Sequence, residues 1–370
     1  MTSLKGRINE AGRIVVKIGS SSLTRADGGL DLNRIDAVAK LVAKWKTVGK
    51  EILIVSSGAV AAGIDPLGMA HRPRDLASVQ AAAAMGQGLL VARWSAAFQA
   101  HHLDVAQVLL TTEDVMRREH YTNVRAALDR LMGFGVVPII NENDAVTTRE
   151  LRFGDNDRLA SYIAQMVAAD ALVLLTDVNG LYTAPPSRPG AALIREVTST
   201  DQLHAVLVTG SGSAIGSGGM VSKVQAATMA ASSGIGVVLT SADELAQVLE
   251  GNESGTWFEP TSIRPASRRL WIAHAAPSRG EILVDEGAGE AVTTGKKSLL
   301  AAGITGVNGH FDSGDVVNIA SPTRLVGRGI VTYDSDTIAQ MAGSSAADLR
   351  LAGWDHPRPI IHRDDLAPVL

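Results

Sequence analysis

The chain has 370 residues, of which 46% are hydrophobic and 19% are charged, so it can bury large cores and is not expected to be disordered. Its formal net charge of −4 argues against a general nucleic-acid-binding protein, and the absence of cysteine excludes disulfides, thiolate metal sites and a cysteine nucleophile. The N-terminal segment lacks the apolar stretch of a signal peptide, and polar residues interrupt every apolar run before about 18 residues. We therefore expect a soluble cytoplasmic protein without a membrane span.

Apolar, β-branched runs alternate with longer helical patterns along the first 260 residues. The predicted strands are residues 13–18, 51–56, 103–110, 135–140, 171–176 and 236–240. The predicted helices are residues 32–48, 75–100, 122–133, 157–168, 221–232 and 243–250. Because short apolar strands that alternate with helices are typical of parallel sheets, we predict an α/β fold with a mainly parallel sheet and helices on both faces.

The pattern changes after residue 258. The segment FEPTSIRPASRR (258–269) contains two prolines and three arginines, which is typical of a linker. Shorter strands with glycine turns follow it, in the stretches EILVDEG, GITGVNGHF, DVVNIA and GRGIVTY. We predict an α/β domain over residues 1–260, a linker over 261–277 and a small β-rich domain over 278–370.

Polar side chains and glycines lie at the ends of four of the predicted strands. They are Lys17 and Gly19, then Ser57 and Gly58, then Asn141, Asn143 and Asp144, and finally Asp177, Asn179 and Gly180. Singly, such residues are explained by tight turns, helix caps or Asx turns. Together they predict a ligand site, because ligands of open α/β sheets bind beyond the carboxyl ends of the strands. Lys17 is the hardest to explain otherwise, since lysine is rarely buried unpaired.

The stretch FGDNDRLASY (153–162) places Asp155, Asn156 and Asp157 at the start of a predicted helix. One such residue is enough to cap a helix, so three in succession indicate a ligand as well.

The Rossmann and P-loop motifs are absent, although GSGSAI (210–215) and GEAVTTGKKS (289–298) resemble them in part. The segment TGSGSAIGSGG (209–219) is instead interpreted as a mobile ligand-binding loop. It leads into SGGMVSK (217–223), whose glycines precede a helix and whose Lys223 adds a cation, all of which suit a phosphate. Lys17 and Lys223 could thus converge on one anion.

Six stretches carry a resemblance to a known family. They are KIGSSSLT, VSSGAVAAG, INENDAV, FGDNDRLA, LLTDVNGLYT and IGSGGMVSK, which follow one another in this order from about Arg13 onward. In order and spacing the chain resembles the glutamate 5-kinases of the amino-acid kinase family, and its C-terminal part resembles a PUA domain. Ser217 is a small departure, because a threonine is usual before GGM; the hydroxyl is kept.

The resemblance implies that the protein transfers the γ-phosphoryl group of ATP, with Mg²⁺, to the side-chain carboxylate of L-glutamate. The product would be γ-glutamyl phosphate, which opens proline biosynthesis. A carboxylate is already a nucleophile at neutral pH, which agrees with the lack of a Ser–His–Asp or Cys–His set. Phosphoryl transfer then requires mainly positioning and neutralisation of charge.

The resemblance also assigns roles to residues. Lys17, Lys223 and Asp157 would be catalytic, with Asp157 holding the two lysines in register. Glutamate would contact Ser57, Asn141, Asp144, Asp155 and Asn156. ATP would contact Lys17, Gly19, Thr176, Asp177, Ser217, Gly218, Gly219, Met220 and Lys223. No protein ligands of a metal follow from it.

The family further suggests a dimer or tetramer and inhibition by proline. The charged segment after LLTTEDV, up to about Asn123, would be a flexible wall of the proline site, although a solvated loop explains it equally well. Two alternatives remain open: a related kinase that acts on N-acetylglutamate, aspartate, carbamate or UMP, and an RNA-binding protein dominated by the C-terminal domain. Residues 268–370 contain ten Lys and Arg against twelve Asp and Glu, which weighs against RNA.

Overall fold

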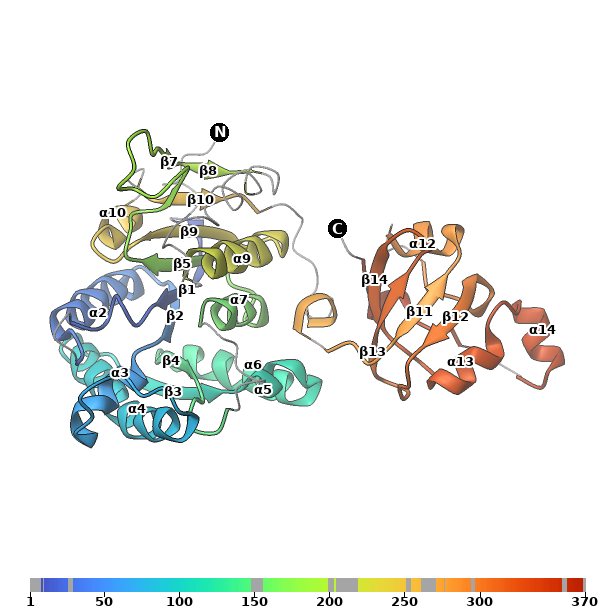
Figure 1. The fold of residues 1–370 in the computed structure, drawn as a ribbon, viewed down its shortest axis with the longest axis horizontal. Helices are drawn as coiled ribbons and strands as arrows, with labels where there is room; N and C mark the ends of the chain where they lie inside the picture. Colours follow the sequence, from blue (N-terminus) through green and yellow to red (C-terminus); the bar gives the residue numbers. More distant parts are fainter. Residues whose placement is uncertain are drawn as a thin grey trace. The chain divides into compact units, whose positions relative to one another are not determined.

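The computed structural model describes residues 8, 10–25, 29–147, 156–198, 203, 219–250, 254–260, 271–275, 277–293, 297–354 and 358–368. The chain divides into two compact units, and the first gives way to the second between residues 264 and 265. Figure 1 shows the helices and strands of each unit.

The first unit is built on an eight-stranded sheet. The strand order is β3 (Val105–Leu110), β4 (Val137–Glu142), β2 (Glu51–Ser56), β1 (Arg13–Ile18), β5 (Ala171–Thr176), β9 (Gly236–Ser241), β10 (Thr256–Phe258) and β8 (Glu196–Val197). Neighbouring strands from β3 to β9 are parallel, whereas β10 runs antiparallel to β9. The prediction of a mainly parallel sheet is confirmed. A two-stranded ribbon, β6 (Leu181–Tyr182) and β7 (Leu193–Ile194), lies outside it.

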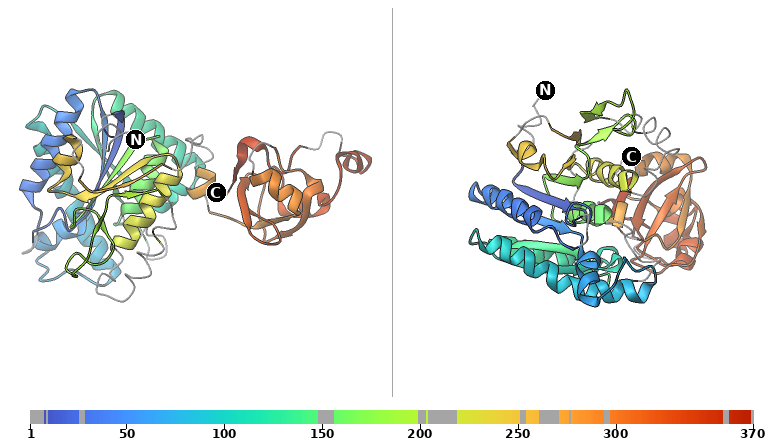
Figure 2. Two further views of the ribbon diagram at one scale, coloured as in Figure 1. Left: turned by 90° about the horizontal axis from the view of Figure 1, so that it is seen from above. Right: turned by 60° about the vertical axis from the view of Figure 1, so that its left-hand side comes forward.

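Helices cover both faces of this sheet (Figures 1 and 2). Helices α2 (Leu32–Thr47), α4 (Leu76–Gln99) and α10 (Leu245–Glu250) share one core with the strands, whereas α7 (Asn156–Met166) and α9 (Gly219–Ser232) pack together on the opposite face. Ile14, Val16 and Ile18 of β1 belong to the first core. Because side chains alternate along a strand, Lys17 projects toward α7 and α9 instead.

The predicted strands 13–18, 51–56 and 171–176 match β1, β2 and β5 residue for residue. The predicted strand 135–140 is displaced, since β4 extends to Glu142. The segment after LLTTEDV is largely helical, because α5 (Thr112–Met116) ends there and α6 (Arg118–Gly133) begins four residues before the predicted helix 122–133. Its role as a flexible wall of a proline site stays a prediction.

A hydrogen-bonded box explains where α5 begins. The Thr111 backbone N–H and hydroxyl each donate to Oδ2 of Asp114, at 2.8 and 2.7 Å, and the Asp114 N–H donates back to the Thr111 hydroxyl at 3.3 Å. This is a capping box, in which a threonine and an acidic residue three positions later satisfy the free donors of the first turn. Partial burial raises the pKa of Asp114, but the hydrogen bonds from Thr111 and His120 outweigh it and hold that pKa below its ordinary value.

The second unit contains a five-stranded sheet, which confirms the predicted β-rich fold. Its order is β12 (Ile304–Asn308), β11 (Glu281–Val284), β13 (Val316–Ala320), β14 (Leu325–Ile330) and β15 (Leu366–Pro368). Three helices accompany the sheet: α12 (Glu286–Thr293), α13 (Ser335–Met341) and α14 (Ala346–Leu351). The unit has its own apolar core, in which Ile282, Val317 and Ile338 are fully buried. In the described part of the whole chain, the helices are too short or too polar to span a bilayer.

Candidate active site

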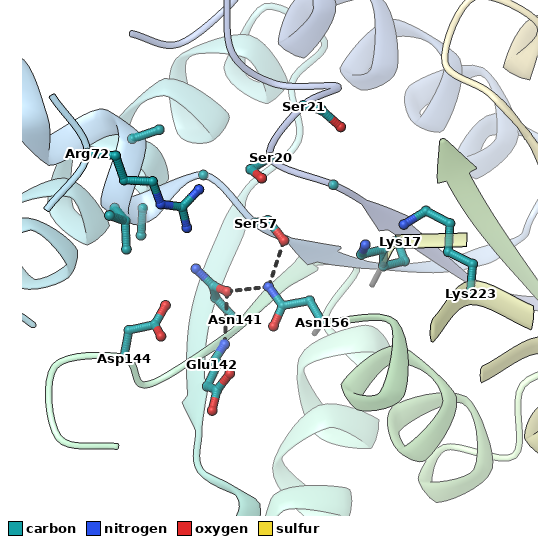
Figure 3. Close-up of a pocket in the computed structure, with 16 residues that line it drawn as sticks. Lys17, Ser20, Ser21, Ser57, Arg72, Asn141, Glu142, Asp144, Asn156 and Lys223 are labelled. Carbon is teal, nitrogen blue, oxygen red and sulfur yellow. Dashed lines mark hydrogen bonds between the residues drawn. The ribbon is translucent and has the colours of Figure 1, made fainter. Parts of the chain in front are cut away.

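A cavity of about 560 Å³ opens at the carboxyl ends of β1, β2 and β4 (Figure 3). It is lined by Lys17, Gly19, Ser20, Ser21, Ser57, Gly58, Ala59, Val60, Ala61, Arg72, Asn141, Glu142, Asp144, Asn156, Gly219 and Lys223. This position is the one that the polar strand ends predict. The volume suits a small metabolite.

Two lysines meet one carboxylate at one end of the cavity. The Nζ atom of Lys17, on β1, lies 2.5 Å from Oδ1 of Asp157, and the Nζ atom of Lys223, on α9, lies 2.9 Å from Oδ2. The Ser222 hydroxyl donates to the same Oδ2 at 3.2 Å. Asp157 is the second residue of α7, where the partial positive charge of the helix N-terminus also favours a carboxylate.

This ion triad carries a surplus positive charge. The side chains of Lys17, Lys223 and Asp157 are only 2%, 10% and 0% exposed, so water screens their charges poorly. Its three groups comprise two cations and one anion. Both lysines line the cavity and Asp157 does not, so the ammonium groups border the space where an anion can bind. The triad therefore favours an anionic ligand.

Asn156 joins the ends of two strands. Its Nδ2 group donates to Oδ1 of Asn141 at 2.8 Å and to the hydroxyl of Ser57 at 2.9 Å (Figure 3). It also donates to the carbonyl of Ser56 at 3.2 Å. The Ser57 hydroxyl does not cap α3 (Ala59–Ile64), whose N-cap is Gly58 with a left-handed φ of 108°. Ser57 is thus available to the cavity, and Asn156 fixes its position.

Asn141 presents a buried donor without a partner. Its Oδ1 accepts from Asn156 and from the Glu142 N–H, at 2.8 and 2.9 Å, which fixes the orientation of the amide. Asn141 is 3% exposed, yet its Nδ2 has no hydrogen-bond partner among the described residues. A buried donor of this kind is costly unless a ligand or water accepts from it. Figure 3 shows this nitrogen on the side of Arg72 and Asp144.

The predicted ATP contacts are only partly gathered at the cavity. Lys17, Gly19, Gly219 and Lys223 line it. Thr176 ends β5 and Asp177 follows it, but these two and Met220 are not among the lining residues. Asp155, Ser217 and Gly218 lie outside the described residues.

Helix α4 holds the loops around the cavity through one row of donors. Gln80 Nε2 donates to the Thr147 carbonyl at 3.4 Å, Gln87 Nε2 to the Glu142 carbonyl at 3.3 Å, and Trp94 Nε1 to the Ser56 hydroxyl at 3.1 Å. These three donors, named here the α4 donor row, lie seven residues apart and therefore on one face of the helix.

The acceptors of the α4 donor row are close in sequence to residues that line the cavity. Glu142 and Thr147 flank the turn that carries Asp144, and Ser56 precedes Ser57. Gln87 is itself held by Gln107 of β3, whose Nε2 donates to Gln87 Oε1 at 3.2 Å. One face of α4, on which Gln87 and Trp94 are buried and Gln80 is half-buried, thus holds the ends of two strands and one turn beside the cavity.

Two glycines set how closely α3 approaches α4. A Cβ on Gly86 would lie 1.8 Å from the Ala59 carbonyl oxygen, and a Cβ on Gly63 would lie 1.9 Å from the Ala82 carbonyl oxygen. Only glycine permits this distance between backbones. Because α3 carries Ala59, Val60 and Ala61 of the cavity wall, the contact also sets the shape of the cavity.

Four polar or charged lining residues were not among the predicted contacts, and neither were the apolar Ala59, Val60 and Ala61; the four are Ser20, Ser21, Arg72 and Glu142. The serines follow Lys17 and Gly19 directly, and Glu142 lies between two predicted residues, so their neighbourhood could have indicated them. Arg72 lies between the short 3₁₀ helix Asp65–Leu67 and α4, far in sequence from any predicted contact. No pattern in its segment indicates a site.

Among the described residues, no group of three or more His, Asp or Glu side chains could hold a metal ion.

Comparison with known proteins agrees with this geometry. Residues 12–241 match the amino acid kinase family and residues 280–351 match the PUA domain. The glutamate 5-kinase of Streptomyces coelicolor is 50% identical over 369 residues, which are 99% of each chain. The glutamate 5-kinase of Salinispora arenicola is 50% identical over 366 residues, which are 98% of this chain and 99% of that protein.

Solved structures agree on the fold. Carbamate kinase from Giardia lamblia, bound to AMP-PNP, has a TM-score of 0.51 and 18% identity, with 68% of this chain and 99% of that chain covered. The chain therefore belongs to the amino acid kinase family and, within it, to the glutamate 5-kinases.

Proposed function

We propose that the protein transfers the γ-phosphoryl group of ATP to the side-chain carboxylate of L-glutamate and releases ADP and γ-glutamyl phosphate, the first step of proline biosynthesis. The observation that carries this proposal is the ion triad: Lys17, Asp157 and Lys223 place a surplus positive charge in the same cavity as Asn141, Asp144 and Asn156. One end of the cavity suits a phosphoryl group and the other suits an amino acid.

At the phosphoryl end, Lys17 and Lys223 neutralise the charge on the transferring oxygens. Asp157 holds each ammonium group at a fixed position, so little reorganisation accompanies the reaction. The backbone N–H groups of Gly19 and of Gly219, the first residue of α9, add donors on the same side. Thr176, Asp177, Ser217, Gly218 and Met220 are proposed to contact the rest of the nucleotide.

At the amino-acid end, the carboxylate of Asp144 is proposed to bind the α-ammonium group of glutamate. Ser57, Asn156 and Asn141 contribute hydroxyl and amide groups, and Asp155 is proposed to support them. The γ-carboxylate attacks the γ-phosphorus atom as it stands, because it is ionised at neutral pH and needs no general base.

Mg²⁺ is proposed to enter with ATP, coordinated chiefly by phosphate oxygens. When bound, it would neutralise phosphate charge and orient the phosphates. The lysines supply the fixed cations of the chain itself.

Formation of a hydroxamate tests the proposed activity. Hydroxylamine traps an acyl phosphate, so the full-length protein with ATP, Mg²⁺ and glutamate should accumulate glutamyl hydroxamate. N-acetylglutamate, aspartate, carbamate and UMP, each offered with radiolabelled ATP, should accept little phosphate. Turnover with one of these acceptors and none with glutamate would assign the protein to another substrate.

We further propose that proline inhibits the enzyme, that it forms dimers or tetramers, and that it acts in the cytoplasm, where ATP and glutamate are available. Proline shares the α-carboxylate and a cationic amine with glutamate. Added proline should therefore shift the glutamate saturation curve, and curves that do not move would reject this regulation.

A further inference from the structure

Arg72 is the one lining residue with a cationic side chain at the amino-acid end of the described cavity. Figure 3 shows its guanidinium group on the side of Asn141 and Asp144, apart from Lys17 and Lys223. The residue is exposed and forms no ion pair with any other residue that the structure describes. Its charge is therefore available to a ligand.

We propose that Arg72 binds the α-carboxylate of the amino-acid substrate, with Nδ2 of Asn141 as a second donor. This inference rests on the proposed function and names a specificity residue for it. Arg72 would select acceptors that carry a free α-carboxylate, and it would contribute to binding rather than to the chemical step.

The distribution of charges over the cavity supports this assignment. Lys17 and Lys223 supply positive charge at one end, whereas Arg72 and the carboxylate of Asp144 lie together on the other side. Glutamate is complementary: it has a γ-carboxylate at one end, and its α-carbon carries both an ammonium group and a carboxylate at the other. Without Arg72, the second carboxylate of the substrate would face Asp144 with no cation to balance it.

Asn141 provides a second, independent observation. Its Nδ2 is buried and has no hydrogen-bond partner in the described structure, and it faces the same part of the cavity as Arg72. The Oδ1 atom of Asn141 already accepts two hydrogen bonds, so the free position can only donate. A donor amide and a guanidinium group together suit a carboxylate and do not suit an ammonium group.

The test compares acceptors that differ only at the α-carbon. Glutamate carries a carboxylate there, its α-amide carries a neutral amide, and 4-aminobutanoate carries neither. In the wild-type enzyme, both analogues should have a higher KM than glutamate. Replacing Arg72 by alanine should raise the KM for glutamate about 10-fold, the effect expected for one charge-assisted hydrogen bond at an exposed site.

The same replacement should change the KM for the α-amide and for 4-aminobutanoate by less than about 2-fold, because the contact is already missing there. The KM for ATP and the kcat with saturating glutamate should stay close to wild type. Arg72→Lys should restore part of the preference for glutamate, since it keeps the charge without the planar fork. Arg74→Ala is the matched control, because Arg74 is a nearby arginine that does not line the cavity.

Three results would overturn the inference. If Arg72→Ala raises the KM for glutamate and the KM for its α-amide equally, Arg72 supports the fold of its loop and does not recognise the α-carboxylate. An unchanged KM for glutamate in Arg72→Ala would remove it from the site. A wild-type protein that forms no hydroxamate from glutamate would overturn the proposed function and this inference with it, whereas an active wild type with an unaltered preference in Arg72→Ala overturns the inference alone.

Discussion

The Nζ atom of Lys17 lies 2.5 Å from Oδ1 of Asp157, and both side chains are almost completely buried. Lys223 pairs with the other carboxylate oxygen, so Asp157 serves both lysines at once. The three residues are therefore not equivalent. Removal of one lysine leaves a balanced pair, whereas removal of Asp157 leaves two cations close together and away from water.

Lys17→Met should accordingly lose turnover, whereas Asp157→Ala should lose folding stability. Lys17→Met keeps most of the volume and an Asp157–Lys223 pair, so it should fold but lose about 100-fold or more in kcat, with a smaller change in the KM for glutamate. Lys223→Met should behave alike. Asp157→Ala should lose about 3–5 kcal/mol of folding free energy, because the carboxylate that contacts two buried ammonium groups is removed. Turnover measurements and urea denaturation distinguish these outcomes, and near-normal turnover of either lysine variant would contradict the catalytic role.

Removing a donor of the α4 donor row should weaken the binding of glutamate without changing the binding of ATP. Gln87→Leu and Trp94→Phe each remove one donor to a loop of the amino-acid end, and each should cost about 1 kcal/mol of stability. We expect the KM for glutamate to rise several-fold while the KM for ATP stays constant. Gln99→Leu, at the exposed end of the same helix, is the control. If both KM values rise together, the row supports the fold in general and not the substrate loops.

Two glycines of α4 offer a test of the α3–α4 contact. In Gly86→Ala, the new methyl group would meet the Ala59 carbonyl oxygen, so α3 must move and the free energy of unfolding should fall by about 2 kcal/mol or more. In Gly88→Ala, nothing lies within 4 Å of the new methyl group. That variant should be more stable by about 0.5–1 kcal/mol, because alanine is the better helix former. Opposite signs for the two changes, measured by urea denaturation, are the expected result; a harmless Gly86→Ala would contradict the tight contact.

A chain that ends at Pro260 should fold and still phosphorylate glutamate. The cavity residues and the eight strands of the first sheet precede that point, and the second unit has a core of its own. Soluble expression of residues 1–260, gel filtration and the hydroxamate assay test this. A folded, monodisperse fragment without activity would mean that residues 261–370 contribute to the active site. Aggregation would mean that they cover an apolar face.

Much of the fold could be predicted because each feature depends on neighbouring residues. The strands β1, β2 and β5 are short apolar runs between turns, and their bounds follow from sequence alone. The convergence of Lys17 and Lys223 could be anticipated for a different reason, because parallel strands and their following helices bring distant segments to one edge. The place of Asp157 between the two lysines followed from the resemblance to the family. The capping box of Thr111 and Asp114 is likewise a local pattern, so the start of α5 is encoded in neighbouring residues.

Arg72 and the α4 donor row could not be predicted in the same way. Their roles depend on which loop lies opposite a given side chain. Gln80, Gln87 and Trp94 are spaced like any buried helical face, and their acceptors are backbone carbonyls and a hydroxyl that carry no sequence signal. Such contacts between a helix and a loop distant in sequence can be identified only in the three-dimensional structure.

The distribution of charges in the cavity has a consequence for which end of the substrate reacts. Cations lie on both sides of the cavity, so positive charge alone does not decide which carboxylate of glutamate receives the phosphoryl group. The carboxylate of Asp144 distinguishes the two sides, because it lies on the side of Arg72, away from the two lysines. In glutamate the ammonium group is borne by the carbon next to the α-carboxylate and lies further from the γ-carboxylate. An ammonium group bound at Asp144 would therefore leave the γ-carboxylate, and not the α-carboxylate, to reach the lysines.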